Sequence, residues 1–423
     1  MKQGAFYTQC IMIDIEFIRK HPQKIAEGLT KRNKDTSLLD QFQSIDNQWR
    51  AATTAIEAIR ANQKKAAQDR NIEQGKQLKE ELKKQEEDLQ HIEKDRYDIL
   101  LEFPNIPFDD VPVGKDEREN KEVKKVGNIP SFDFPIRDHV ELGESLGIID
   151  IKTAAEVAGS RFYYLKGKAA LLEVALLHFA FDTLSKEGFE AVIPPVMIRP
   201  DVYEKMGRLS TSQREERYFL SKENLYLIGS AEHTLGPLRM DTTLDEHAFP
   251  KRYVGFSTAF RQEAGTYGKD TRGILRVHQF DKVELYAFSL PEKSEEEHRF
   301  LLSMQEKLFS LLEIPYRVVA ICTGDMGPTD ARQFDIEAWI PSQNTYREIA
   351  SCSNTTDYQT RGISAKVKKT DGTIHYAHAL NATGIAMGRT IIALLENNQQ
   401  ADGSIRMPKA LIPYCGYDTI THE

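Results

Sequence analysis

Apolar residues in the first hundred positions recur with the period of packed helices. From residue 42 to 66 they are spaced alternately by three and four, and the same spacing returns from residue 78 to 103. Each run forms a heptad seam, and the break at residues 70–75 reverses the chain direction. Three polar residues fall on this seam and dilute it: Gln63, Gln85 and Arg96. The pattern therefore predicts a flexible, antiparallel helical hairpin.

The later part of the chain mixes helical and strand periodicities. Apolar positions at helical spacing run from 168 to 186, and residues 189–197 form a strand pattern that ends in prolines. A short apolar strand is expected at the start of 226–235. Taken by itself, the segment 378–395 has the pattern of a buried amphipathic helix.

Helix-breaking residues mark the boundary between these two parts. Four of them stand close together: Pro104, Pro107, Pro112 and Gly114. A charged stretch follows and is expected to be an exposed connection. We therefore predict a helical hairpin at 12–103, a linker at 104–125 and a larger domain at 126–423. Residues 1–11 precede a second methionine and receive no function.

Composition narrows the class of protein. The 423 residues suffice for two or three domains, and 40% hydrophobic with 28% charged residues is typical of a globular protein. No apolar run reaches the length of a membrane span, and residues 1–11 lack the layout of a secretion signal. The net charge of −8 argues against general nucleic-acid affinity but leaves room for a local basic patch.

Cysteine usage points to a reducing compartment. The four cysteines Cys10, Cys322, Cys352 and Cys415 have no CxxC spacing. This favours free thiols in a cytoplasmic protein over a disulfide framework, and it gives no sign of a structural zinc site.

The stretch from Phe260 to Phe288 carries the densest chemistry. It reads as two strands, 254–260 and 274–288, joined by a glycine-rich loop at 265–273, with one slip in the second alternation near Phe280. Four charged residues would lie on or beside one sheet surface: Arg261, Glu263, Arg276 and Glu284. Strand arginines suit the capture of a carboxylate or phosphate, the phenylalanine could stack a flat ring, and Glu284 could bind an ammonium or a hydroxyl. An ordinary surface hairpin with ion pairs has a similar composition.

The order of the residues in this stretch is more specific than its composition. Phe-Arg-x-Glu, Asp-Thr-Arg-Gly and Arg-x-His-Gln-Phe-x-Lys-x-Glu closely resemble motif 2 of class II aminoacyl-tRNA synthetases, in the variant of the seryl-tRNA synthetase family. The sequence NTYREIASCSN at 344–354 is similar to that family's NTYREISSCSN. The helix and strand at 168–197 resemble motif 1, and 378–395 resembles motif 3. The resemblance covers nearly the whole chain.

The resemblance implies a fold and an activity. The fold would be α+β: an antiparallel sheet flanked by helices, preceded by an N-terminal antiparallel coiled-coil arm. The activity would be that of a ligase that converts L-serine and ATP to seryl-adenylate. The seryl group would then pass to the 3′ end of tRNA(Ser), with tRNA(Sec) as a second candidate. Mg²⁺ would assist, and motif 1 implies a homodimer.

Site residues carry over one by one on the matching motifs. Catalytic roles fall on Arg261, Glu348 and Arg389, and Arg261 would bridge the serine carboxylate and the α-phosphate. Serine would be bound by Ser230, Ala231, Glu232, Arg261, Glu284, Asn381 and Thr383. ATP would be bound by Arg261, Gln262, Glu263, Arg276, Val277, Phe280, Glu348, Ile349, Ala350, Ser351 and Arg389. Magnesium would be held by Glu348 and Ser351. Ser230 and Thr383 depart from the family's usual threonine and serine, but each keeps the hydroxyl.

The hairpin gains a role from the same resemblance, since the family uses its arm to reach the long variable arm of tRNA. Basic residues near the turn are candidate phosphate contacts: Lys64, Lys65, Arg70, Lys76, Lys79 and Lys83. Several have acidic neighbours and could form solvated ion pairs. Without the resemblance, such a hairpin would equally be a spacer or a dimerisation element.

Two other functions stay open from the sequence. A related ligase that loads an amino acid onto a carrier protein would lack the arm. A catalytically inactive paralogue would have lost some of Arg261, Glu284, Glu348 and Arg389, and all four are present. A zinc-dependent seryl enzyme is disfavoured, because the serine site has no evident Cys/His ligand set.

Overall fold

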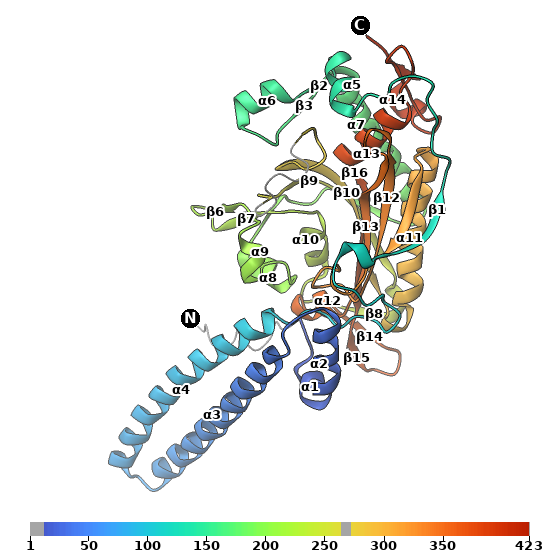
Figure 1. Cartoon of the computed structure of the whole chain (residues 1–423). Helices are drawn as coiled ribbons and strands as arrows, with labels where there is room; N and C mark the ends of the chain where they lie inside the picture. The colour runs from blue at the N-terminus through green and yellow to red at the C-terminus, as the bar shows by residue number, and fades with distance from the viewer. Residues whose placement is uncertain (1–11, 264–271, 423) are drawn as a thin grey trace. The chain divides into compact units, whose positions relative to one another are not determined.

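The chain forms two compact units, each with its own core. The computed structural model describes residues 12–263 and 272–422 (Figure 1). The N-terminal unit is Met1–Ile106 and the C-terminal unit is Pro107–Glu423. The segment 1–11 and most of the predicted glycine-rich loop at 265–273 lie outside the described residues.

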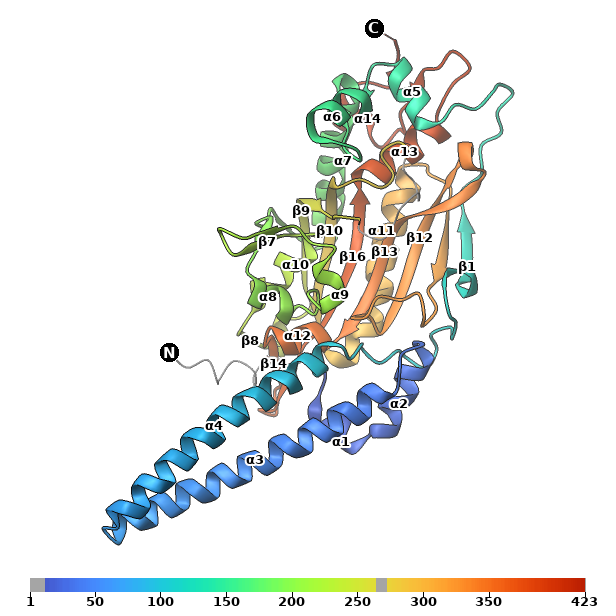
Figure 2. The ribbon, with the colours of Figure 1, turned by 60° about the vertical axis from the view of Figure 1, so that its left-hand side comes forward.

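The N-terminal unit is helical. Its described helices are α1 (Ile15–Lys20), α2 (Pro22–Lys31), α3 (Ser37–Gln68) and α4 (Ile72–Leu101). The two long helices lie side by side as a hairpin (Figure 2). Asp14 accepts hydrogen bonds from the first turn of α1, and Asn71 caps α4 in the same way. The cap at Asn71 explains why the turn is shorter than the predicted break at 70–75.

The heptad prediction is confirmed along the hairpin. Ile56 and Ile59 on α3 are buried, and Leu82 and Leu89 on α4 are half-buried. Near the other end of the pair, Phe42 packs edge-on against Phe103, with ring centroids 5.9 Å apart. This base of the hairpin forms an apolar core with residues of α1 and α2.

Arg96 behaves differently from the sequence prediction, which treated it as a weak seam position. It is 5% exposed, and its Nε donates to Asp46 Oδ1 over 2.8 Å. Arg19 of α1 donates to both oxygens of the same carboxylate, at 2.8 and 2.9 Å. The Arg96 guanidinium also lies 4.6 Å from the ring centroid of Trp49. This buried ion cluster ties α1, α3 and α4 together at the base of the hairpin.

An eight-stranded sheet organises the described part of the C-terminal unit. Its order is β1-β11-β12-β13-β16-β10-β9-β4. The strands are β1 (Lys121–Val126), β4 (Glu190–Val192), β9 (Lys251–Phe260), β10 (Gln279–Ser289), β11 (Tyr316–Ala320), β12 (Arg332–Ile340), β13 (Thr345–Thr356) and β16 (His378–Ala386). All neighbours pair antiparallel except β4 and β9, which are parallel. The predicted α+β class is confirmed.

Three helices pack against this sheet and bury a common apolar core. They are α7 (Gly167–Ser185), α11 (Ser294–Leu311) and α13 (Met387–Asn397), seen alongside the sheet in Figures 1 and 2. The helix predicted at 168–186 is therefore confirmed. In α7, Leu172, Leu176 and Leu184 are fully buried, which matches its apolar period.

Shorter elements complete the unit. The helices are α5 (His139–Ser145), α6 (Ile151–Ala158), α8 (Pro200–Lys205), α9 (Thr211–Arg214), α10 (Glu232–Leu235), α12 (Tyr358–Gly362) and α14 (Ile412–Cys415). The 3₁₀ turns are Glu117–Glu119, Gly236–Arg239, Glu246–Ala248, Pro291–Lys293 and Pro341–Gln343. The strands are β2 (Ile149–Asp150), β3 (Tyr164–Leu165), β5 (Met197–Ile198), β6 (Phe219–Leu220), β7 (Leu225–Leu227), β8 (Thr243–Asp245), β14 (Lys366–Lys368), β15 (Ile374–Tyr376), β17 (Ile405–Arg406) and β18 (Thr419–Ile420).

Several predicted boundaries change in the structure. The segment 378–395 is strand β16 followed by helix α13, because a strand buried on both faces has no alternation to separate it from a buried helix. Residues 274–278 precede β10 and are not part of it. The strand predicted at 189–197 is split into β4 and β5. The exposed residues 121–126, expected as a connection, pair with β11 as an edge strand.

No helix in the described residues is both long and apolar enough to cross a membrane.

His298 of α11 couples the stability of the C-terminal unit to pH. Its Nε2 lies 3.0 Å from the Cys352 carbonyl, and since a carbonyl only accepts, Nε2 carries the proton. Burial lowers the pKa of His298 from 6.5 to about 4. Between these pH values the unfolded chain binds a proton that the folded chain does not. The stability that neutral, buried His298 contributes is therefore complete above pH 6.5 and is lost as the pH falls towards 4.

We therefore expect the His298→Gln variant, which keeps a donor for the carbonyl, to lose less stability on acidification. The expected difference in the free energy of unfolding is about 3 kcal/mol. It is followed through the pH dependence of the thermal midpoint of the C-terminal unit. His91→Gln, an exposed histidine on α4, is the control. A parental pH slope in the His298 variant would contradict the assignment.

Candidate active site

A cleft opens on one face of the sheet. Strands β10, β13 and β16 form its floor, and the residue after β9 and the start of α13 border it. Its charged lining residues are Arg261, Glu263, Arg276, Lys282, Glu348 and Arg389. The structure therefore gathers residues from motifs separated by more than a hundred positions.

Strand β10 sets the order of groups across this floor. Because side chains alternate along a strand, Phe280, Lys282, Glu284 and Tyr286 share one face. In the pairing with β16, Glu284 stands opposite Thr383, next to a register shift between Val283 and Glu284. Phe280, the Lys282–Glu284 pair and Tyr286 thus follow one another along one face of a single strand.

Arg261 lies where β9 ends and joins two parts of the site. Its Nε and Nη2 donate to the carbonyl of Gly229 over 3.2 and 3.1 Å, and its guanidinium lies 5.1 Å from the Phe280 ring centroid. Burial, with the nearby cations Arg217 and Arg389, lowers the pKa of Arg261. An anion bound in the cleft would relieve that repulsion.

The remaining arginines of the cleft pair with carboxylates. Arg276 Nη1 donates to Glu263 Oε2 over 2.7 Å. Arg389 Nη1 lies 3.1 Å from Glu348 Oε1 and donates to the Glu348 carbonyl over 3.0 Å. The Arg389 charge is the main cause that holds the pKa of Glu348 below its usual value. Both pairs are partly open to solvent, so incoming ligands could exchange them.

Deeper in the unit, Glu284 is buried beside a cation. It is 2% exposed and in ionic contact with Lys282, which is 6% exposed. Burial raises the pKa of Glu284, and Lys282 opposes that shift. On the neighbouring strand β16, buried Asn381 shares a face with Thr383. Its Nδ2 has no hydrogen-bond partner within the described residues. A ligand hydroxyl could donate to Glu284 and accept from Asn381 Nδ2.

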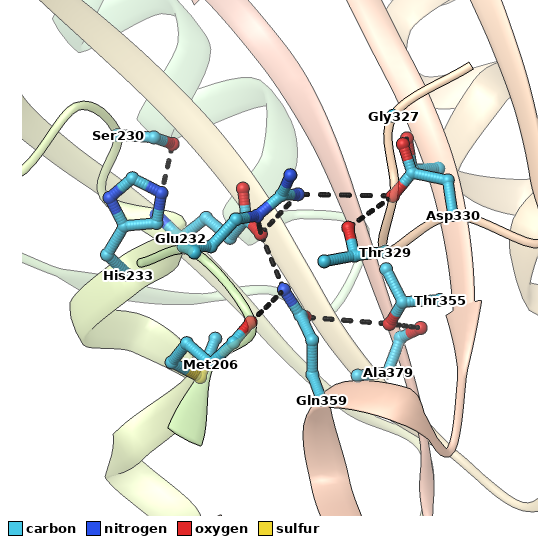
Figure 3. A network of polar contacts seen from close by, with 12 residues as sticks. Met206, Ser230, Glu232, His233, Gly327, Thr329, Asp330, Thr355, Gln359 and Ala379 are labelled. Carbon is cyan, nitrogen blue, oxygen red and sulfur yellow. Dashed lines mark hydrogen bonds and ion pairs between the residues drawn. The ribbon is translucent and has the colours of Figure 1, made fainter. Parts of the chain in front are cut away.

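A second polar network surrounds Glu232 at the start of α10 (Figure 3). Its Oε1 accepts from Arg208 Nε and Nη2 over 2.9 and 2.7 Å, and from Gln359 Nε2 over 2.7 Å. Ser230 Oγ accepts from the Glu232 backbone N–H over 3.2 Å. Glu232 and Glu284 interact electrostatically, so the two buried carboxylates bound a common region.

Most predicted site residues fall in or beside this cleft, although their contributions differ. Val277, Ile349, Ser351 and Thr383 line it along with the charged residues and Phe280. Ala231 is fully buried in an apolar cluster, so it can offer only its backbone. Ala350 is likewise buried in the main core.

Gln262 does not line the cleft. Its Nε2 donates to the Arg217 carbonyl over 2.8 Å, and its backbone N–H donates to the Glu216 carbonyl over 3.1 Å. The side chain therefore braces the neighbouring segment and leaves only its backbone near the site.

Two glycines of the segment 378–395 allow close packing in different elements. Gly384 is a strand residue, and a Cβ there would lie 2.8 Å from Leu285 Cδ1. Gly388 is in α13, where a Cβ would lie 3.1 Å from the Ile274 carbonyl. Both positions therefore favour glycine, one in a strand and one in a helix.

Sequence reasoning missed three polar residues of the site. Lys282 was visible in the Lys-x-Glu signature, yet only the glutamate was assigned. Arg208 and Gln359 carried no local signal, because they reach Glu232 from 24 and 127 residues away.

A magnesium ion is compatible with the donor set. Glu348 and Ser351 both line the cleft, and the Glu348 side chain is 48% exposed. No cluster of three or more His, Cys, Asp or Glu suited to a metal occurs in the described residues. Mg²⁺ commonly uses one or two carboxylates and takes its other ligands from phosphates and water, so this sparse set fits it.

Family comparisons agree with this geometry. Residues 218–398 match the tRNA synthetase class II core domain (G, H, P, S and T), and residues 12–107 match the seryl-tRNA synthetase N-terminal domain. The fold is thus that of a class II synthetase. The serine–tRNA ligase of Corynebacterium kroppenstedtii is 42% identical over 97% of this chain and 99% of its own. That of Acidothermus cellulolyticus is 43% identical over the same shares.

Solved structures extend the match to three dimensions. Pyrococcus horikoshii seryl-tRNA synthetase, complexed with ATP, has a TM-score of 0.90 and 38% identity, covering 97% of this chain and 100% of its own. The Naegleria fowleri enzyme, in complex with AMP, has a TM-score of 0.85 and 33% identity, covering 96% and 97%. The chain belongs to the seryl-tRNA synthetase family.

Proposed function

We propose that this chain activates L-serine with ATP and transfers the seryl group to tRNA(Ser). The observation that carries the proposal is the cleft itself. It places Arg261, Arg276 and Arg389, which suit phosphates, in one lining with Lys282, and Lys282 pairs with buried Glu284. tRNA(Sec) is a second candidate acceptor.

In the first step, an oxygen of the serine carboxylate attacks the α-phosphorus of ATP. The bond from that phosphorus to the bridging oxygen breaks, and pyrophosphate leaves. No side chain needs to act as nucleophile, so catalysis comes from positioning and charge stabilisation. Arg261, held by the Gly229 carbonyl, can face both the carboxylate and the α-phosphate.

The ATP side of the cleft has the complementary groups. Phe280 offers a ring face for adenine, and Val277 lines the wall near it. Arg276 and Arg389 would exchange their carboxylate partners for phosphates. Glu348 and Ser351 would hold Mg²⁺, which supplies further charge neutralisation at the phosphates. In the second step, a terminal ribose hydroxyl attacks the seryl carbonyl and AMP leaves.

Serine would lie between the two buried carboxylates. Glu232 would bind its ammonium, and Glu284, with Thr383 opposite, would bind its hydroxyl. Alanine lacks that hydroxyl and would leave buried polar groups unpaired, which a hydrogen-bonding pocket rejects strongly.

The first test is ATP–pyrophosphate exchange on the purified chain without tRNA. We expect exchange with serine and far less with alanine, threonine, glycine or cysteine. Glu284→Ala should reduce kcat/KM for serine by about 100-fold or more, because the hydroxyl loses a charged acceptor, while the fold is retained. Glu296→Ala, at an exposed position on α11, is the control. Unchanged serine kinetics in the Glu284 variant would remove it from the site, and no exchange with any amino acid would favour an inactive paralogue.

We propose that the helical hairpin binds tRNA. The candidate residues Lys64, Lys65, Arg70, Lys76, Lys79 and Lys83 are all exposed on α3, α4 and their turn. Lys83 lies 3.9 Å from Glu87, an exposed pair that is cheap to break for a phosphate. A carrier-protein ligase would have no use for this surface.

The arm can be shortened without disturbing its base. Trp49 Nε1 and Glu93 Oε1 are 3.4 Å apart, so a short Gly/Ser turn can replace residues 50–92 and leave Asp46 and Arg96 in place. We expect this variant to keep serine-dependent exchange and to lose tRNA charging by orders of magnitude. Charging at the parental rate would show that the distal arm is dispensable.

We also propose a homodimer built on α7. Leu171 and Val174 on this helix are 56% and 64% exposed, although the opposite face is in the core. Large apolar residues exposed together suit an interface with a second copy. The Leu171→Glu/Val174→Glu double variant should halve the mass measured by light scattering. Ile374→Glu, at a 57% exposed position on β15, should not change it. A monomeric parent protein would refute the dimer.

A cytoplasmic location is part of the proposal. Cys322, Cys352 and Cys415 are free thiols in the structure, which suits a reducing compartment.

A further inference from the structure

The Glu232 carboxylate is held on one side only. All three of its side-chain donors, two from Arg208 and one from Gln359, converge on Oε1. Oε2 accepts no hydrogen bond in the described part of the chain. The carboxylate thus has one anchored oxygen and one available oxygen.

The amide of Gln359 can have only one orientation here. An ionised carboxylate accepts but never donates, so the amide nitrogen must face Glu232. The amide oxygen then accepts from the Tyr286 hydroxyl over 2.9 Å. Both side chains are completely buried, so no water competes for this arrangement. Tyr286 is two residues beyond Glu284 on the same face of β10, which links the network to the serine pocket.

Arg208 also lies near a second carboxylate. One of its terminal nitrogens lies 3.9 Å from Asp330 Oδ1. Asp330 in turn accepts from Thr329 over 2.8 Å and from Ser353 over 3.1 Å, as Figure 3 shows in part. Asp330, which is bonded to Ser353 of the central sheet, therefore helps to hold the guanidinium beside Glu232.

The charge state agrees with this geometry. Burial alone would raise the pKa of Glu232, but Arg208 and Gln359 hold it below its usual range. Burial raises the pKa of nearby Glu284, although its ion pair with Lys282 opposes that shift. The donors around Glu232 therefore favour its ionised form.

We propose that Arg208, Gln359 and Tyr286 are positioning residues that fix Oε1 of Glu232 so that Oε2 faces the ammonium group of the amino-acid substrate. The inference rests on the proposed role of Glu232. It assigns to three buried side chains a part in amino-acid affinity that does not involve contact with ATP or with the reacting atoms.

The test is the KM for serine and the KM for ATP in pyrophosphate exchange. Gln359→Met keeps the length of the side chain but removes its donor, and Arg208→Lys keeps the charge but loses the paired donation. Each should raise the KM for serine about tenfold or more and leave the KM for ATP within about twofold. Tyr286→Phe removes a single hydroxyl and should give a smaller change of the same kind.

A pH profile separates positioning from general support of the fold. Gln359→Glu is isosteric and places a second carboxylate within hydrogen-bond reach of Glu232, so the pair must share a proton. Serine binding needs ionised Glu232. The acid limb of kcat/KM for serine should therefore move to higher pH by about one unit or more.

The controls are a matched buried pair and a matched buried amide. Arg252 donates to both oxygens of Glu297 over 2.6 and 2.8 Å, and Gln399 donates to the Arg137 carbonyl over 3.0 Å, both outside the cleft. Arg252→Lys and Gln399→Met should leave both KM values and the pH profile unchanged.

Glu232→Gln distinguishes the two levels of the argument. If that variant keeps the parental KM for serine, the proposed role of Glu232 fails. If it raises the KM but the Arg208, Gln359 and Tyr286 variants do not, the positioning inference is overturned and the role of Glu232 stands. An equal rise of both KM values, or an unmoved acid limb in Gln359→Glu, also overturns it. Should the larger changes fail to fold, Tyr286→Phe and the pH profile decide.

Discussion

Burial of opposite charges along β10 is the constraint on which the site depends. Lys282, Glu284 and Glu232 are each less than a tenth exposed. Charges in such a place are tolerated only when partners compensate the lost hydration. The partners are Lys282 on β10 itself, Arg208 after α8 and Gln359 of α12, so the charges are compensated only when these segments are assembled.

From this fixed interior, polar pairing becomes looser towards the mouth of the cleft. Three donors hold one oxygen of buried Glu232, whereas Arg389 and Glu348 are 26% and 48% exposed at the side chain. Exposed pairs have little net stability and can be replaced by a ligand. A synthetase needs both kinds of contact. Rigid groups are needed to select the amino acid, while the phosphates must enter and leave.

The N-terminal unit shows a similar change along its length. At its base, Asp46 is shared by Arg19 and Arg96, and an aromatic core surrounds them. Beyond Ala66, the seam has few apolar side chains and the basic residues are exposed. A firm base with a polar end suits an element that carries charge to a flexible, anionic partner.

The sequence by itself determined the elements whose signals are local. Heptad spacing predicted the hairpin, helical spacing predicted α7, and the motif around Arg261 identified the family. These predictions succeed because a period of 3.5 residues, or a short run of charged and aromatic residues, is read within one element. The same reasoning misjudged Arg96, since nothing near it in the chain reveals the carboxylate that pairs with it.

Tertiary structure alone decided the remainder. It placed 378–386 in a strand, because a segment buried on both faces has no alternation that could distinguish strand from helix. It added 121–126 to the sheet edge. It also brought Arg208 and Gln359 to one oxygen of Glu232 from 24 and 127 residues away. A hydrogen bond between residues so far apart exists only once the sheet and its helices are assembled, and no local pattern in the chain records it.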